Sequence, residues 1–517
     1  MADTGVLLRC IGLLLLLSWI LRLFYTVWWK PKRLERFFKQ QGVVGPPYRL
    51  LFGNLKEFLS SMKEAQLKPM NLSHKIIPRV APFFENTMVN YGKTSITWFG
   101  PSPRIHVMDP EMMKEILTNK FGEFEKPEVN PQIKLLLTGI AVLEGEKWAK
   151  HRRIINPAFH MEKIKRMLPA FSASCREMMS RWDKSAGSEG SFELDAWPEI
   201  QNLTGDVISR AAFGSNYREG NRIFQLQREQ AKYLVEAADS VYIPGFRFLP
   251  TKKNRRRQAI DREVRGLVTG MIKKREKALM LGEAPTDDLL GLLLESNFRE
   301  PQEQGNSKGM TTEEVIRECK LFYFAGQETT AVLLTWTLIV LAMHPSWQDR
   351  ARDEILDVFG KNKVPEEFDA LSHLKIVTMI LYEVLRLYPP LVFLLRGVTK
   401  DIELGGICLP AGTEIVVPTL LVHHDNDLWG HDAEEFNPER FSEGIAKATN
   451  NKVCFIPFGW GPRICIGQNF ALVEAKLVLA MILQKFSFRL SPSYAHAPHS
   501  LITIHPQHGA QIIFHKL

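Results

Sequence analysis

The sequence predicts one mainly α-helical domain with a smaller β portion, preceded by an N-terminal transmembrane helix. Residues 6–29 are dominated by Leu, Ile, Val, Phe and Trp, and about 20 apolar residues suffice to cross a bilayer. Apolar side chains recur at helical spacing from about residue 111 to residue 350, and again over 471–485. Alternating stretches at 94–98, 104–108 and 407–418 predict short strands.

The composition supports a single large domain. The chain has 517 residues, a formal net charge of +9 and 45% hydrophobic residues, which suit a globular protein with a large core. The usual ~150 residues per domain would suggest roughly three domains, but no long linker, repeat or low-complexity tract divides the chain. The six cysteines form no C-x-x-C pair and fit neither a zinc site nor a disulfide framework. A reducing compartment is therefore expected.

The N-terminal apolar segment predicts three regions: a signal-anchor helix over 1–29, a basic and proline-rich hinge over 30–55, and the folded domain over 56–517. A cleavable signal peptide, the alternative, would have a shorter apolar core and a small-residue cleavage site, and neither is present. Basic residues follow the helix directly, from Lys30 to Lys39, which predicts a cytosolic domain. Gly45, Pro46 and Pro47 would form a rigid elbow, or an ordinary turn before the first strand.

Residues 458–467 read F-G-W-G-P-R-I-C-I-G and contain the cysteine with the clearest chemical context. An isolated cysteine in a glycine-rich turn is usually a buried structural residue, and a dinucleotide-binding loop would need glycine where Ile464 stands. The segment instead resembles the haem-binding signature of the cytochrome P-450 (haem-thiolate monooxygenase) superfamily, F-x-x-G-x-R-x-C-x-G. All five fixed positions match: Phe458, Gly461, Arg463, Cys465 and Gly467.

The resemblance implies a haem b cofactor whose iron takes the Cys465 thiolate as its axial ligand. A thiolate donates electron density to the iron, which favours cleavage of the O–O bond. The N–H groups at the start of the helix after Cys465 would stabilise the anionic sulfur. The resemblance also pairs Arg463 with a haem propionate and lays Phe458 over the proximal side of the ring. Gly459 and Gly467 would belong to the cofactor-binding loop, where glycine permits close backbone approach.

A second motif, A-G-Q-E-T-T over 325–330, lies inside the long apolar helical pattern of residues 313–343. It resembles the A-G-x-E/D-T motif on the helix that crosses the distal haem face in this family. That likeness would set Ala325 against the haem, with Gly326 leaving room above the ring. A threonine hydroxyl can bond back to a carbonyl one turn earlier and open a groove there. The resemblance implies catalytic roles for Thr329, in hydrogen bonding, and Glu328, in proton relay. Taken alone, the motif would fit a simple helix contact equally well.

Further motifs predict residues that hold the cofactor or its loop. In E-x-x-R, Glu383 and Arg386 share one face of a helix and can form an ion pair. The resemblance adds Arg440 as a third member of this structural charge network. The remaining positions that the resemblance sets near the haem propionates are Trp148, Arg152 and Arg396.

The chain contains no flavin or nicotinamide fingerprint, so electrons must come from another protein. The resemblance implies an NADPH-dependent flavoprotein reductase in the same membrane, O2 as co-substrate, and a single-pass protein of the endoplasmic reticulum. A cationic face that includes Lys147, Lys150 and Lys452 would suit an acidic electron donor. A solvated helix face is an equal alternative.

The resemblance extends over nearly the whole chain and is greatest for a plant clan that contains secologanin synthase and triterpenoid oxidases. It implies oxygen insertion into a small hydrophobic substrate. A triterpenoid or iridoid is preferred, and a plant hormone (gibberellin, cytokinin or brassinosteroid) is the alternative. A peroxide-rearranging isomerase or dehydratase and a non-catalytic haem-binding membrane protein fit less well, because both motifs are intact. The candidate pocket residues are Phe322, Phe324, Leu394, Leu395, Leu501, Ile502 and residues 135–139.

Two other clusters have simpler explanations. The basic run over 252–257 lacks the aromatic or groove-reading partners of a nucleic-acid site, so contact with lipid head groups or plain solvation is expected. His423, His424 and His431 could suggest a metal site. They lie in a stretch that leads straight into the loop at Pro438, and a structural role is the favoured interpretation.

Overall fold

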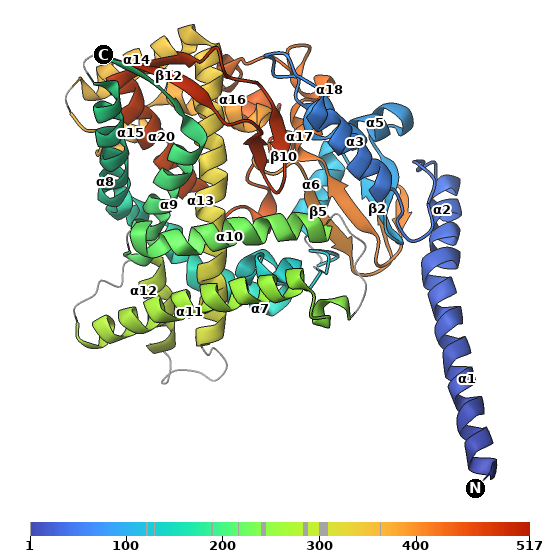
Figure 1. The fold of residues 1–517 in the computed structure, drawn as a ribbon. Helices are drawn as coiled ribbons and strands as arrows, with labels where there is room; N and C mark the ends of the chain where they lie inside the picture. The colour runs from blue at the N-terminus through green and yellow to red at the C-terminus, as the bar shows by residue number, and fades with distance from the viewer. Residues whose placement is uncertain are drawn as a thin grey trace.

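The structure is a computed structural model that describes residues 2–119, 122–128, 130–187, 190–215, 217–238, 245–282, 288–298, 309–361 and 363–517. Helices make up most of the body, the strands form small sheets, and the N-terminal helix projects away from the rest (Figure 1). The predicted fold class, mainly α with a smaller β portion behind an N-terminal apolar helix, is confirmed.

The helices cover most of the predicted helical stretches. The N-terminal half contains α1 (Ala2–Phe24), α2 (Lys30–Gln40), α3 (Leu55–Leu67), α4 (Ile77–Val80), α5 (Pro82–Tyr91), α6 (Pro110–Thr118), α7 (Gly145–Ile155), α8 (Met161–Ala186), α9 (Ala196–Phe213) and α10 (Tyr217–Ala238). The C-terminal half contains α11 (Lys252–Met280), α12 (Leu289–Phe298), α13 (Thr312–Met343), α14 (Pro345–Phe359), α15 (Phe368–Ser372), α16 (Lys375–Leu387), α17 (Thr419–His423), α18 (Asn426–Trp429), α19 (Ile445–Ala448) and α20 (Gln468–Lys485).

The strands pair into a five-stranded sheet in the order β1-β2-β8-β5-β3, a three-stranded sheet in the order β4-β12-β9, and the hairpins β6-β7 and β10-β11. Only the β2–β8 pairing is parallel among the described strands. The strands are β1 (Ser95–Phe99), β2 (Ser102–His106), β3 (Phe124–Glu125), β4 (Ser191–Asp195), β5 (Leu394–Val398), β6 (Ile402–Leu404), β7 (Ile407–Leu409), β8 (Glu414–Val417), β9 (Phe486–Leu490), β10 (Pro498–Ser500), β11 (Ile504–Pro506) and β12 (Gln511–Lys516).

Helix α13 is the central element of the body and packs against α9, α11, α16 and α20 (Figure 1). It begins with a capping box, in which Thr311 and Glu314 satisfy each other's backbone N–H groups. All side chains from residue 318 to residue 341 are buried except those at Ala325, Gly326 and Thr329, which are half-buried. The helix therefore has one short open patch in its middle, at the sequence motif.

The N-terminal segment is a continuous helix over residues 5–40, apolar and long enough to cross a membrane, with none of its apolar window buried. The helix passes the predicted boundary at residue 29 without a break. Helix α13 meets the same criteria of length and apolarity within the described chain, but it is mostly buried and is therefore a core helix.

Pro31 explains a local change in the N-terminal helix, the candidate membrane anchor. Proline has no backbone N–H, so the carbonyl of Val27 one turn earlier loses its helical partner. A five-residue π-turn, Tyr25–Trp29, precedes the proline. The hydroxyl of Tyr48 donates a hydrogen bond to the Val27 carbonyl oxygen, and Glu35 accepts from the Tyr48 backbone N–H at 2.7 Å. These contacts attach the end of the anchor to the body.

The predicted elbow at Gly45 lies directly against strand β1. A Cβ atom at Gly45 would fall 1.7 Å from the carbonyl oxygen of Ile96, so no side chain fits there. The N–H of Ile96 donates to the carbonyl of Val44 at 3.1 Å. Glycine at this position therefore allows the chain that follows the anchor to pack on the sheet.

Candidate active site

The cysteine loop adopts a backbone that depends on two glycines. Gly459 and Gly461 have φ angles of 75° and 69°, in the left-handed region. A Cβ atom at Gly461 would also lie 2.5 Å from the carbonyl oxygen of Leu117. The loop closes with a 2.8 Å hydrogen bond from the Cys465 N–H to the Phe458 carbonyl. These constraints fix the cysteine at the start of α20.

The Cys465 sulfur receives hydrogen bonds from the backbone N–H groups of Gly467 and Gln468, as expected at a helix N-terminus. The side chain is exposed at an open cavity of about 260 Å³, which Arg152 and Phe159 also line. Burial raises the pKa of the Cys465 thiol, while the two N–H groups and nearby Arg152 lower it in part. A bound metal ion would lower the pKa of the thiol further and so favour the thiolate.

A group of cations lies next to the cysteine loop. Arg396 is 7% exposed, and the one hydrogen bond that the described residues give its guanidinium goes to the Leu395 carbonyl, at 2.8 Å. Burial, with neighbouring Arg463, lowers the pKa of Arg396 to about 10. Burial, with Arg396 and Arg463 close by, also lowers the pKa of Lys126 to about 8. Like charges therefore crowd a buried region.

Glu144 supplies the carboxylate bonded to this group. It forms an ion pair with Arg463 and accepts a 3.0 Å hydrogen bond from the backbone N–H of Lys126. The cations outnumber this carboxylate, so the region suits a ligand that brings negative charge. Two carboxylates of a haem would provide it, and the residues present therefore fit the cofactor. Sequence reasoning missed Lys126 and Glu144, because neither belongs to a spaced motif.

Helix α7 presents Trp148 and Arg152, two of the predicted cofactor-binding residues, to the same loop. The guanidinium of Arg463 lies over the Trp148 ring, 4.1 Å from its centroid. Arg152 donates to the carbonyl of Ile464 at 2.9 Å. The structure thus brings Trp148, Arg152, Arg463 and Cys465 together, and Arg396 joins them through its electrostatic contact with Arg463.

On α13, the Thr329 hydroxyl donates to the carbonyl of Ala325 at 2.8 Å, one turn earlier, as the motif predicts. The lack of a side chain at Gly326 serves helix packing: a Cβ atom there would lie 2.8 Å from Cδ1 of Ile208 on α9. The room expected beside Gly326 is thus filled by Ile208, while Ala325 and Thr329 line the open patch.

The Glu328 carboxylate turns toward the β10–β11 hairpin. Its Oε1 atom lies 2.8 Å from the Thr503 hydroxyl and 2.5 Å from Nε2 of His505. Gln201 of α9 donates to Oε2 at 3.5 Å. Burial raises the pKa of Glu328, but the contacts with His505 and Thr503 outweigh it and leave the pKa below its ordinary value. Nothing in the sequence pattern connects this hairpin with Glu328.

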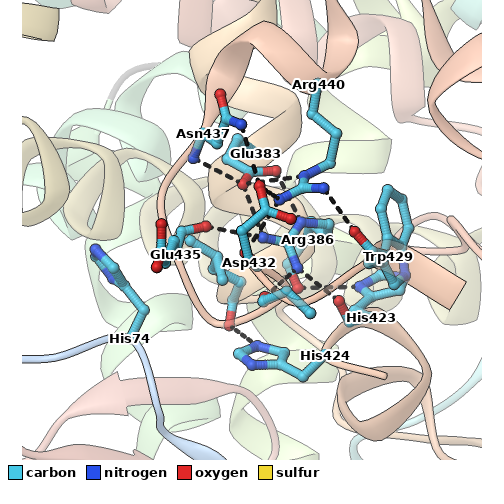
Figure 2. Close-up of polar contacts among 12 residues, drawn as sticks. His74, Glu383, Arg386, His423, His424, Trp429, Asp432, Glu435, Asn437 and Arg440 are labelled. Atoms are coloured by element: carbon cyan, nitrogen blue, oxygen red, sulfur yellow. Dashed lines mark hydrogen bonds and ion pairs between the residues drawn. The ribbon is translucent and has the colours of Figure 1, made fainter. Parts of the chain in front are cut away.

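The E-x-x-R pair forms the centre of a closed network (Figure 2). Arg386 donates two hydrogen bonds to the Glu383 carboxylate, at 2.8 and 2.7 Å. Its other donors reach the carbonyls of His423, Ala433 and Glu435. Arg440 lies 3.7 Å from Glu383 and binds Asp432 at 2.7 Å. The predicted trio is therefore brought together, with Asp432 as an additional partner.

The neighbouring histidines have backbone partners. His423 accepts a 3.0 Å hydrogen bond from the Ile456 N–H, just before the cysteine loop, and its other nitrogen lies 3.2 Å from the Arg386 carbonyl. His424 bonds the Leu387 carbonyl at 2.9 Å. Burial lowers the pKa of His424 to about 3. These contacts support the structural interpretation and link the Arg386 network to the cysteine loop.

Some of the candidate pocket residues come together in a small apolar cluster, separate from the main core. Phe324 packs there with Leu136 and Leu234, and Ile502 lies at the edge. Phe322 instead stacks on Phe159, with ring centroids 5.4 Å apart. Leu394 and Leu395 lie on β5, half-buried, and Leu501 is exposed. The sequence did not indicate the contributions of Leu234 and Phe159.

The whole chain resembles known proteins of one family. The family model for cytochrome P450 matches residues 69–508. The chain is 59% identical to cytochrome P450 CYP72A616 of Paris polyphylla, over 97% of both chains. It is 54% identical to 11-oxo-beta-amyrin 30-oxidase of Glycyrrhiza uralensis, over 96% of both chains. It is also 52% identical to secologanin synthase 1 of Catharanthus roseus, over 97% of this chain and 96% of the relative.

The cysteine at a helix N-terminus, the cation cluster and the opened central helix together fit a haem-thiolate site. The chain belongs to the cytochrome P450 family and is a monooxygenase. The family uses haem b and O2, with electrons that originate in NADPH and arrive through a reductase. The bound haem supplies the redox-active iron at which O2 is activated.

Proposed function

We propose that this protein is a membrane-anchored oxygenase of terpenoids, preferably triterpenoids or iridoids. The apolar cluster around Phe324 carries this proposal. Its member Phe324 lies on the same helix as Ala325 and Thr329, and its half-buried rim includes Ile133, Leu137 and Ile502. Such a surface favours a hydrophobic skeleton with few polar groups. The relatives named secologanin synthase and 11-oxo-beta-amyrin 30-oxidase favour a terpenoid over a hormone acid.

In this proposal the Cys465 thiolate would hold the haem iron, and the cations around it would hold the haem propionates. Arg396, Lys126 and Arg463 would share two carboxylates with Glu144 as counter-charge, and Arg152 would lie beside the thiolate. Phe458, Gly459 and Gly467 shape the loop on the cysteine side. Because α20 directs N–H groups at the sulfur, the loop stabilises a negative charge there.

The same proposal assigns proton handling to Glu328 and Thr329. The bond from Thr329 to Ala325 keeps the hydroxyl at the open patch of α13. A hydroxyl both donates and accepts, so it can pass a proton without carrying charge. Glu328 is buried and partnered by a histidine, which makes it a suitable intermediate between solvent and this patch.

Electrons would come from an NADPH-dependent flavoprotein reductase in the endoplasmic reticulum membrane. The helix over residues 5–40 anchors the chain, and the basic residues after the apolar segment favour a cytosolic domain. Lys147 and Arg153 of α7 are exposed, as is Lys452 before the cysteine loop. We propose this cationic face as the contact for an acidic reductase surface.

Coexpression with a plant reductase in a triterpene-producing host tests the proposal. We expect products that carry one or more added oxygen atoms, detected by mass spectrometry, and no such products from Cys465→Ala. Protease added to intact microsomes should digest the domain, because we expect it to face the cytosol. Untouched terpenoids together with conversion of a gibberellin, cytokinin or brassinosteroid would contradict the substrate proposal.

A further inference from the structure

The β10–β11 hairpin binds the buried carboxylate of Glu328 through two side chains that differ in what they can do. Thr503 and His505 both lie within 3 Å of the same Glu328 oxygen, at 2.8 and 2.5 Å. They also touch each other at 2.7 Å. A threonine hydroxyl brings a hydrogen bond but stays neutral, whereas an imidazole can take up and release a proton near neutral pH. His505 is therefore the partner through which the proton content of this pair can change.

His505 extends between solvent and the interior. Its side chain is 21% exposed, whereas that of Glu328 is 7% exposed. The ring packs against Trp197 of α9, with centroids 4.9 Å apart, which holds its orientation. The third side chain bonded to Glu328, that of Gln201, is buried and has no titratable proton. The route from solvent to the carboxylate that the described residues offer thus runs through one imidazole ring.

Other titratable groups surround this route without replacing His505. Arg228 of α10 acts electrostatically on Glu328 but cannot release a proton at physiological pH. His499 lies opposite His505 in the hairpin register, and burial lowers its pKa to about 4, so it stays neutral. His508 is exposed and follows β11.

We propose that His505 is the proton-relay residue that supplies Glu328 from bulk solvent, a role that rests on the proposed function of Glu328 and Thr329. A proton from water adds to the outer ring nitrogen, and the proton on Nε2 passes to Oε1 of Glu328. The ring is then neutral, with its proton on the outer nitrogen, and it returns to its first tautomer when that proton moves to Nε2 through water or by a turn of the ring. No oxidant or other co-reactant is needed, because each cycle moves one proton inward.

The first test compares His505→Gln with His505→Ala in the full-length holoenzyme with reductase. Glutamine keeps a donor near Glu328 but cannot transfer a proton, and alanine removes both functions. A relay predicts that both variants lose about tenfold or more in NADPH-driven turnover of 11-oxo-beta-amyrin or, if that is not a substrate, of the product-forming terpenoid. Their solvent isotope effect in D2O should increase. His508→Gln is the matched control and should behave as wild type.

The outcomes for these variants separate the possible roles. Wild-type turnover by His505→Gln with a slow His505→Ala would show that the histidine only braces Glu328, and the relay would be overturned. Fast turnover by both variants would overturn it too. Glu328→Gln distinguishes the two proposals: if it turns over normally, the proposed function of Glu328 fails. If it is slow while His505→Gln is fast, only the relay fails.

A second measurement is independent of turnover and of haem. Diethylpyrocarbonate modifies imidazole nitrogens, and mass spectrometry gives the rate at which His505 is labelled. Nε2 of His505 is hydrogen-bonded to the Glu328 carboxylate, so Glu328→Ala should increase the labelling rate of His505. An unchanged rate would mean that the two side chains are not coupled, which contradicts the proposal.

Discussion

Two buried arginines of this protein differ in how completely the chain satisfies them. Arg386 uses all five of its N–H donors, on Glu383 and on three backbone carbonyls. Arg396, almost as deeply buried, has one hydrogen bond from the described residues, to its neighbour Leu395. The first network is complete within the protein, which indicates a structural role. The second leaves donors for a negatively charged group from outside.

The largest effect should come from breaking the complete network. Arg386→Met removes the partner of the fully buried Glu383 carboxylate and leaves an uncompensated charge, which costs about 3–5 kcal/mol of stability. Thermal or urea unfolding followed by circular dichroism measures the loss. Arg350→Ala serves as control, since Arg350 pairs with Glu439 at the surface and should change stability by less than about 1 kcal/mol. Equal losses of stability in Arg386→Met and Arg350→Ala would contradict the structural role of the Arg386 network.

Breaking the incomplete cluster around Arg396 should reduce haem binding without lowering the stability of the haem-free protein. Arg396→Gln relieves repulsion with Arg463 and Lys126, so the haem-free protein should be as stable as wild type or slightly more stable. Haem retention should fall by about tenfold, because a charge-assisted hydrogen bond to a propionate is lost. Haem retention is measured as the ratio of haem absorbance to protein absorbance after dialysis against apomyoglobin, which takes up released haem. Unchanged haem retention would show that Arg396 does not contact the cofactor.

The stability of the protein should also depend on pH, through buried histidines near the Arg386 network. Burial lowers the pKa of His424, beside the Arg386 network, and of His74 to about 3, against an unfolded value of about 6.5. The unfolded chain therefore binds more protons below pH ~6.5, and stability falls as pH decreases from there. Between pH ~6.5 and pH ~5.5 each histidine should remove about 1 kcal/mol. His74→Gln should flatten this slope, measured by urea unfolding at both pH values.

The smallest predicted effect concerns the anchor. Tyr48→Phe leaves the carbonyl of Val27 without the hydroxyl that replaces the missing N–H of Pro31. One neutral hydrogen bond contributes about 1 kcal/mol. Limited proteolysis of the protein in nanodiscs should therefore cut more rapidly after residue 40 in the variant. An unaltered cleavage rate would show that the Tyr48 contact does not hold the anchor to the body.

The sequence was sufficient where chemistry needs a fixed spacing along one element. The three-residue spacing of Glu383 and Arg386 predicts their ion pair, because helix geometry alone brings them together. The turn-back bond of Thr329 to Ala325 and the N–H groups facing Cys465 follow from helix geometry in the same way. Each of these contacts is local or lies at a helix end.

Contacts between distant segments could not be derived from spacing. His505 and Glu328 are 177 residues apart and meet only because the hairpin folds over α13. Lys126 joins Arg396 and Arg463 from the segment just after the short strand β3, which has no motif of its own. The ring of Phe322, a candidate pocket residue, stacks on Phe159, which lies far away in the sequence. Tertiary packing decides which way such a side chain turns.

The carbon monoxide difference spectrum of the reduced full-length protein tests the central claim most directly. A thiolate from Cys465 on the iron predicts a band at about 450 nm, which Cys465→His should lose while the protein still binds haem. A band at about 420 nm in every folded preparation of the wild-type protein would contradict thiolate ligation, and with it the assignment of this site.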